Sequence, residues 1–305
     1  MEGGKPLAEL SRFLFVRGLW LIVIEFTLVR VAWTFELGFS SGAFAGVIWV
    51  IGASMIVLAA LVYLPRAALI AFALAMIVGH NLFDAVSAPE IGGVGGVIWR
   101  VLHEPGRVRL GSFNVYVLYP LIPWIGVMAA GYGLGPVMQL APQKRQRLLL
   151  ALGAVITLGF VVLRATNFYG DPAPWTAQAT PLATALSFVN CEKYPPSLLF
   201  LMMTLGPALM LLGAFAYWRG RLAGWLRTFG QVPFFFYVAH IYLIHALAVA
   251  AAFAMTGIVF QRPELGFGLP AVYGVWLVVI VLLYPLCRRF AGFKERREEW
   301  WWRYL

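Results

Sequence analysis

Residues 198–217 read LLFLMMTLGPALMLLGAFAY, a run of 20 residues without a charged side chain. A helix needs about 20 mostly apolar residues to cross the hydrocarbon core of a bilayer, so this run predicts a membrane-spanning helix. The whole chain shares this character: of its 305 residues 62% are hydrophobic and only 12% are charged, and its mean hydropathy is +0.83. Soluble domains carry roughly 25% charged residues. The composition therefore excludes a soluble, disordered or disulfide-scaffold protein and predicts an integral membrane protein.

Eight segments are long and apolar enough to span a membrane. They are 13–34, 43–64, 67–84, 113–138, 146–166, 194–218, 232–258 and 268–287. The runs are continuously apolar rather than alternating, which favours helices over the strands of an outer-membrane barrel. We therefore predict an all-α polytopic bundle, with one transmembrane domain over residues 1–305 and about eight spanning helices.

Lysine and arginine are distributed unevenly between the predicted loops. With the amino terminus in the cytoplasm, 16 of the 23 lie on the inner side and five on the outer side, while Arg30 and Arg164 lie inside outer helix ends. This bias predicts that both termini of a multi-pass membrane protein are cytoplasmic. The net charge of +10 then reflects topology, and we expect membrane lipids rather than nucleic acid as partners. Cys191 and Cys287 fall on opposite sides and are not expected to pair.

The carboxyl-terminal residues 288–305 are basic and rich in tryptophan. Tryptophan and basic side chains are enriched at the headgroup level of membranes. We therefore predict a cytoplasmic interfacial tail, with Trp300, Trp301 and Trp302 at headgroup depth.

Polar residues collect at the predicted outer ends of helices. In GHNLFD, residues 79–84, His80 and Asp84 are four residues apart and share a helix face. The carboxylate could fix the tautomer of the imidazole and raise its basicity, which is the arrangement of a general base. The alternative is a helix end that has reached water, where Asn81 and Asp84 cap the following loop.

A second polar group begins the sixth predicted span, in NCEKYPPS at residues 190–197. It offers an acid, a cation and a phenol at one membrane face, close in depth to the end of the preceding helix. The predicted substrate-binding residues are Asn81, Arg164, Asn167, Glu192, Lys193 and Tyr194. The alternatives are structural: Arg164 extends its guanidinium to the headgroups, and Asn190 and Glu192 support the start of a helix.

Glu25, His240 and His245 lie inside predicted spans. An unpaired charge at that depth costs about 2.5–3.5 kcal/mol on insertion scales, so we expect Glu25 to be protonated, to face a cavity, or to pair with a basic or hydroxyl group on a neighbouring helix. The two histidines are five residues apart and therefore about 140° apart around the helix, which excludes a two-histidine zinc site there. Interhelical hydrogen bonds, with Tyr237 and Tyr242 as neighbours, are the alternative to catalysis.

Other chemical signatures are absent from the sequence, which contains no P-loop, GxSxG, HExxH or CxxC pattern, and we expect no metal. Six strings carry a resemblance instead. They are RGLWLIVIEFTLVRVAW (17–33), GHNLFD (79–84), LYPLIPWIGVMAAGYGLG (118–135), YGDPAPW (169–175), FVNCEKYPPSLLFLMMTLGPALMLL (188–212) and VPFFFYVAHIYLIH (232–245). Over about residues 10–250 the chain resembles a bacterial family of uncharacterised multispanning proteins. That family is similar in turn to the catalytic domain of heparan-alpha-glucosaminide N-acetyltransferase, and more distantly to other transmembrane acyltransferases.

The resemblance implies a helical bundle in which an acyl group from cytosolic acyl-CoA, here acetyl-CoA, reaches an acceptor such as a sugar or glycolipid at the opposite face. It also implies that relatives carry another helical hairpin before the segment equivalent to residue 10, and that the catalytic histidine of the family lies in that hairpin. We expect this hairpin to be absent here. On chemical grounds His80, oriented by Asp84, is the expected substitute.

The leading hypothesis is thus a membrane acyltransferase. Its cytosolic cations Lys144, Arg145, Arg147, Arg219 and Arg221 would attract the phosphates of CoA, although the positive-inside rule also explains them. A second hypothesis is a proton-coupled transporter or small-molecule-binding protein with Glu25, His240 and His245 as a protonatable path, but the sequence has no matching pair of broken helices. A third is an inactive, amino-terminally truncated fragment. The sequence does not specify an oligomeric state.

Overall fold

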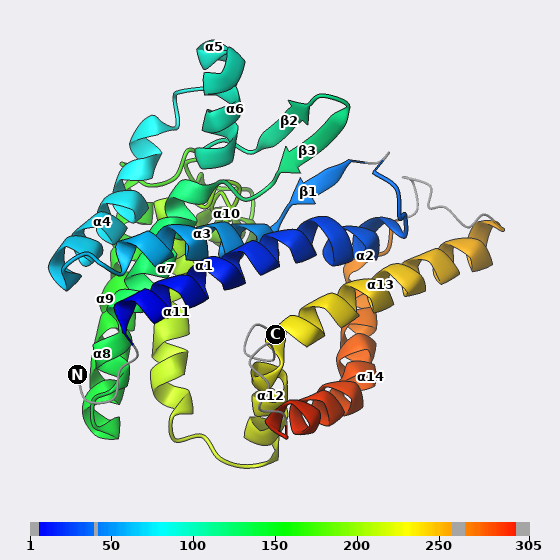
Figure 1. Cartoon of the computed structure of the whole chain (residues 1–305). Coiled ribbons are helices and arrows are strands. Elements are labelled where there is room, and N and C mark those ends of the chain that lie inside the picture. Colours follow the sequence, from blue (N-terminus) through cyan, green and yellow to red (C-terminus); the bar gives the residue numbers. More distant parts are fainter. Residues whose placement is uncertain (1–5, 40–41, 258–265, 297–305) are drawn as a thin grey trace. The chain divides into compact units, whose positions relative to one another are not determined.

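The computed structural model describes residues 6–39, 42–257 and 266–296. Its residues form two compact units, which are described separately (Figure 1). Unit 1 comprises residues 1–25 and 42–217, and unit 2 comprises residues 26–41 and 218–305, as far as these ranges are described.

Unit 1 contains a small sheet and most of the helices. Its elements are α1 (Leu7–Ile24), β1 (Ala43–Ala45), α3 (Val47–Leu61), α4 (Arg66–Gly79), the 3₁₀ helix η2 (His80–Phe83), α5 (Ala88–Ile91), α6 (Gly93–Leu102), β2 (Gly106–Leu110), β3 (Phe113–Val117), α7 (Leu121–Gly133), α8 (Gly135–Met138), α9 (Pro142–Thr166), α10 (Pro181–Val189) and α11 (Leu198–Phe215). In Figure 1 the sheet, α5 and α6 gather at one end of this unit, above α3 and α7.

Unit 2 is helical in its described part. Its elements are α2 (Arg30–Thr34), α12 (Arg221–Gln231), α13 (Pro233–Thr256) and α14 (Leu269–Glu295). The π-helix η1 (Glu25–Val29) joins α1 to α2, and its first residue belongs to unit 1. The predicted span 13–34 therefore consists of three consecutive helical segments.

Five helices within the described ranges are long and apolar enough to cross a membrane. They are Arg66–Phe83, Pro142–Thr166, Leu198–Phe215, Pro233–Met255 and Leu269–Glu295. Each corresponds to a predicted span, and together they define a multi-pass membrane protein. The total of eight spans stays a prediction.

The predicted spans 43–64 and 113–138 were wrong as uninterrupted helices. Each begins as a strand and continues as a shorter apolar helix, α3 with 15 residues and α7 with 13. The strands form one sheet of order β1-β3-β2, with β1 parallel and β2 antiparallel to β3. Val115 and Val117 of β3 are buried while Tyr116 is exposed, the alternation expected of a strand. Apolar content alone does not separate such a strand from the end of a helix.

Glycines allow the main helix pairs of unit 1 to approach closely. A Cβ atom at Gly18 of α1 would lie 2.5 Å from the carbonyl oxygen of Gly52 in α3, and one at Gly153 of α9 would lie 2.6 Å from that of Gly206 in α11. Small residues at such crossings let backbones meet in lipid, where packing rather than the hydrophobic effect drives association. The α9–α11 pair positions the loop that forms one wall of the site described below.

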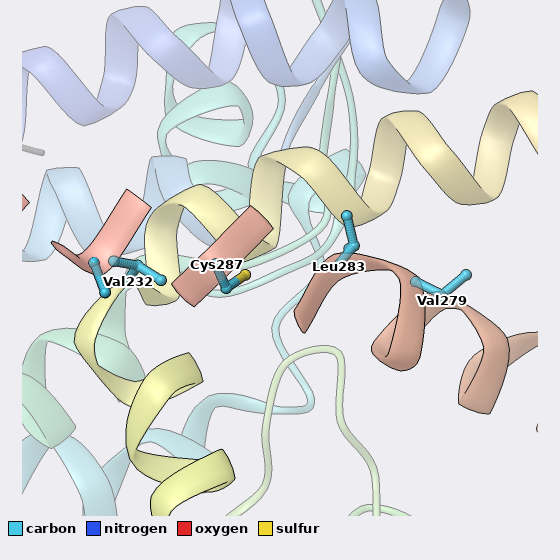
Figure 2. Packing of buried hydrophobic residues seen from close by; sticks show 5 residues of the cluster. Val232, Val279, Leu283 and Cys287 are labelled. Atoms are coloured by element: carbon cyan, nitrogen blue, oxygen red, sulfur yellow. The ribbon is translucent and has the colours of Figure 1, made fainter. Parts of the chain in front are cut away.

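The core of unit 2 forms where α14 meets the start of α13. Val279, Leu283 and Cys287 recur every four residues on one face of α14 and share a buried cluster with Val232, the residue before α13 (Figure 2). Because α14 continues to Glu295, the first eight residues of the predicted 288–305 tail are helical. Residues 297–305, with the three tryptophans, lie outside the described residues.

Candidate functional site

The two long connections of unit 1 meet in a cavity of about 290 Å³. We call it the acidic pocket, because three carboxylates and an imidazole contribute to its wall. Its polar lining residues are Asn81, Asp84, Ser87, His103, Glu104, Glu192 and Tyr194. A larger hollow of about 610 Å³ along α10 has no ionisable side chain in its lining. The acidic pocket is therefore the better candidate for chemistry.

His103 and Asp84 form the central pair of the acidic pocket. The Nε2 atom of His103 lies 3.4 Å from Oδ1 of Asp84, and His103 is only 3% exposed. Its Nδ1 atom is buried and has no hydrogen-bond partner among the described residues. Asp84 is fixed in turn by Asn81, whose Nδ2 donates to Oδ2 at 2.8 Å. A carboxylate facing one imidazole nitrogen holds a hydrogen there and leaves the other nitrogen as a proton acceptor.

The segment from α5 to α6 places His103 against Asp84. Trp99 Nε1 donates to the carbonyl of Val86 at 2.8 Å, and the backbone N–H of Ala88 donates to Glu104 at 2.5 Å. The ring of Trp99 lies 4.9 Å, centre to centre, from that of His103. These contacts return the chain after α6 to the end of α4, so residues 19 positions apart in sequence become neighbours.

His80 is adjacent to this pair but is used differently from our prediction. It is 1% exposed, its Nε2 donates to the carbonyl of Pro196 at 2.9 Å, and its Nδ1 faces the carbonyl of Ile77 at 3.0 Å. The predicted orientation of His80 by Asp84 is wrong, because Asp84 faces His103 and Asn81 instead. His80 is also not among the lining residues. Its contacts join α4 to the start of α11, a positioning role.

Arg164 is buried and holds the 167–197 loop in place through hydrogen bonds. The predicted alternative, in which its side chain reaches the lipid headgroups, is wrong. Its guanidinium donates hydrogen bonds of 2.8–3.2 Å to four backbone carbonyls and lies 3.6 Å from Asp171. The carbonyls belong to Ala173, Ser187, Phe188 and Asn190. A guanidinium has five N–H donors, and four of them are used by these carbonyls, while Asp171 lies beside the group. Arg164 does not line the acidic pocket, and its predicted binding of substrate stays a prediction.

Asp171 and Asn167 complete the support of this loop. Asp171 Oδ2 accepts from the backbone N–H of Glu192 at 2.9 Å and from the hydroxyl of Ser197 at 2.7 Å. Asn167 ends α9 with a positive φ of 49°, and both ends of its amide bond the backbone of Trp175. Asn167 therefore closes a turn, and it does not line the acidic pocket.

Glu192 and Tyr194 reach the acidic pocket from this loop, and their binding of a substrate stays a prediction. Lys193 does not line it: its ammonium lies 5.1 Å from the centre of the Tyr194 ring. Burial alone would raise the pKa of the Tyr194 phenol, but the hydrogen bond with Tyr119 and the ammonium of Lys193 outweigh it and lower the pKa. Burial raises the pKa of the neighbouring Cys191 thiol to about 11, so this thiol stays protonated at neutral pH.

The predicted intramembrane polar residues have backbone partners. Glu25 accepts from the N–H of Trp49 at 2.9 Å, at the start of α3, so its partner is a helix N-terminus and not the basic or hydroxyl group that we expected. His245 donates to the carbonyl of Ala32 at 2.9 Å, and His240 to that of Phe236 at 3.1 Å. These bonds give each residue a structural explanation.

Sequence reasoning missed His103. It lies in the predicted outer connection 85–112, on the same side as Asp84, and is one of only four histidines in the chain. Those two facts were the features of the sequence that could have marked His103 as a candidate partner of Asp84. No group of three or more His, Cys, Asp or Glu side chains within the described ranges is arranged to hold a metal ion.

The long apolar helices define a multi-pass membrane protein, and its acidic pocket holds a carboxylate–imidazole pair at a helix end. The comparisons with known proteins name its family. The family described as heparan-alpha-glucosaminide N-acetyltransferase, catalytic, has a model that matches residues 8–169, and the chain belongs to this family. The predicted resemblance is thereby confirmed over this range, which includes Asp84 and His103. No curated protein and no solved structure matches the chain.

Proposed function

We propose that this protein is a membrane acetyltransferase that moves an acetyl group from cytosolic acetyl-CoA to an acceptor held in the acidic pocket at the outer face. The observation that carries the proposal is the Asp84–His103 pair in a cavity, within a chain that belongs to an acetyltransferase family. The acceptor class suggested by the family description is an amino sugar.

The chemistry assigns one role to each member of the pair. Asp84 orients the imidazole of His103 through Nε2, and His103, which lines the acidic pocket, takes the proton of the acceptor amine or hydroxyl. The thioester arm of acetyl-CoA enters the bundle from the cytosolic side, and the acceptor nitrogen or oxygen attacks its acetyl carbonyl carbon. The carbon–sulfur bond then breaks, and the proton passes from His103 to the departing thiolate. Tyr194 and Glu192 line the same cavity and position the acceptor.

The arrangement of α9 supports a donor on the opposite side from the acceptor. Lys144, Arg145 and Arg147 lie at its start, whereas Arg164 lies at its end, beside the loop that shapes the acidic pocket. A helix of 25 residues is about 37 Å long, enough to cross the bilayer. We propose that the basic end faces cytosolic CoA, with both termini on that side, eight spans and a location in the bacterial inner membrane. Arg219 and Arg221 belong to the same proposed cytosolic face.

Acetyl transfer is tested with the purified full chain in liposomes, [¹⁴C]acetyl-CoA and methyl glucosaminide as acceptor. We expect acetylated product from the wild-type protein and a loss of roughly 10²–10⁴-fold with His103→Gln, the range for a general base. His240→Gln is the matched control, because the imidazole of His240 bonds the carbonyl of Phe236 on its own helix and His240 does not line the acidic pocket. Equal rates for wild type and His103→Gln would refute the assignment, and proton-coupled uptake of the sugar without acetylation would favour transport instead.

A further inference from the structure

Helix α6 exposes apolar residues where a water-facing helix would expose polar ones. Val94, Gly95 and Ile98 lie on its exposed side, and Val94 is 76% exposed; Ile91 at the end of α5 is exposed as well. The opposite side is occupied: a Cβ at Gly96 would meet the carbonyl oxygen of Ala88 at 2.5 Å, and Arg100 turns to Glu104. The exposed side of α6 is therefore apolar and is not covered by unit 1 within the described residues.

This side of α6 continues the lipid-facing surface of α4. Leu74, Val78 and Leu82 are exposed at successive turns of the spanning segment Arg66–Phe83. At its end the ring of Phe83 contacts that of Trp99 edge to face, 6.1 Å between centres. The end of this membrane-spanning segment therefore packs against α6, and the exposed apolar residues of both helices lie near one another at this end of the unit. We call the two sets together the α4–α6 apolar surface.

The α4–α6 apolar surface adjoins the acidic pocket. Val86 and Ser87, which connect η2 to α5, line that cavity. Val86 also accepts the hydrogen bond of Trp99, and Ser87 forms a capping box with Glu90. The wall of the pocket and the apolar surface are therefore built from one hydrogen-bonded segment, so a ligand can occupy both.

We propose that the acceptor is an amphiphile, whose amine- or hydroxyl-bearing headgroup enters the acidic pocket while its hydrocarbon chain stays in the leaflet along the α4–α6 apolar surface. This inference rests on the proposed acetyltransferase function. The carboxylates of Asp84, Glu104 and Glu192 favour a headgroup that is neutral or cationic over an anionic one. A free sugar would use the pocket alone.

The first test compares two acceptors that share a headgroup, dodecyl glucosaminide and methyl glucosaminide, in phosphatidylcholine liposomes. We expect kcat/KM to be at least about 10-fold higher for the dodecyl compound, because each buried methylene adds affinity. Val94→Gln and Ile98→Gln should each lower the dodecyl rate about 10-fold and leave the methyl rate unchanged. Leu182→Gln is the control, since Leu182 on α10 is 71% exposed and does not line the acidic pocket. Equal use of both acceptors by the wild type, or unchanged dodecyl rates in both α6 variants, would overturn the inference.

A second measurement does not depend on turnover. A dodecyl glucosaminide with a diazirine in its chain is photo-crosslinked to the full-length protein, and the labelled peptides are mapped. We expect labelling of residues 91–98 that excess dodecyl glucosaminide suppresses and methyl glucosaminide does not. Labelling without acetylation would refute the proposed function and leave the amphiphile site standing, whereas acetylation of methyl glucosaminide without labelling of α6 would do the reverse.

Discussion

Two regions of the molecule hold histidines in apolar surroundings, and they use the imidazoles differently. In α13, His240 and His245 each donate Nδ1 to a backbone carbonyl and stack on a phenylalanine ring. At the end of α4, His80 is held by carbonyls in the same way, but His103 faces Asp84 and has an Nδ1 with no partner in the described part of the chain. The partner atoms, rather than depth in the membrane, separate a structural histidine from a candidate base.

The largest expected effect concerns the support of the site in unit 1. Arg164→Met leaves the buried carboxylate of Asp171 without its cation and four loop carbonyls without donors, so we expect unfolding free energy to fall by about 3–5 kcal/mol. Denaturant unfolding in detergent micelles measures this fall in the free energy of unfolding.

The matched control is Arg30→Met, because Arg30 is also buried near a helix end. Its Nη2 donates to the carbonyls of Glu36, Leu37 and Gly38, while Nε and Nη1 have no hydrogen-bond partner among the described residues. We expect a smaller loss, about 1–2 kcal/mol. Equal losses for the two variants would show that the ion pair with Asp171 does not distinguish these arginines.

The sequence predicted the spanning helices well because a run of 20 apolar residues can be recognised without knowing its neighbours. Helices α9, α11, α13 and α14 begin and end within a few residues of their predicted spans, apart from the longer end of α14. Strand β1 was missed because Ala43–Ala45 is as apolar as a helix end, and only its pairing with β3 defines it. Pairing is a long-range property that local composition does not contain.

The candidate site was predicted only in part, again because some of its contacts join residues that are far apart in the sequence. Asp84, Glu192 and Tyr194 stood out as polar residues at helix ends, and the structure brings them to one cavity. The partner of Asp84 could not be read from spacing, because His103 reaches it only after α5 and α6 turn back. The role of Arg164 was equally hidden, since its partners are backbone carbonyls that any sequence would supply.

The next effect sharpens the contrast between His103 and the structural histidines. Asp84→Asn removes the negative charge opposite Nε2 while keeping the size of the side chain, so His103 loses the group that fixes its tautomer. We expect kcat for acetyl transfer to fall about 10²-fold. Glu90→Gln is the control: Glu90 belongs to the same segment but does not line the acidic pocket, and its variant should keep the wild-type kcat. A matching fall in both variants would mean that the segment, and not the Asp84–His103 pair, controls the rate.

The smallest expected effect tests whether the hydrogen-bond partners of a histidine distinguish a structural role from a catalytic one. His245→Leu loses one hydrogen bond of 2.9 Å to Ala32 and the stacking on Phe35, so we expect a stability loss of about 1 kcal/mol in thermal unfolding and no change in acetyl transfer. His103→Leu should show the opposite pattern. The variant loses the 3.4 Å contact of Nε2 with Asp84 but also the cost of burying an Nδ1 that has no hydrogen-bond partner within the described residues, so stability should change little while transfer disappears. If His245→Leu instead abolished transfer while the protein stayed folded, the histidines of α13 would belong to the chemistry, and backbone carbonyl partners would no longer mark a histidine as structural.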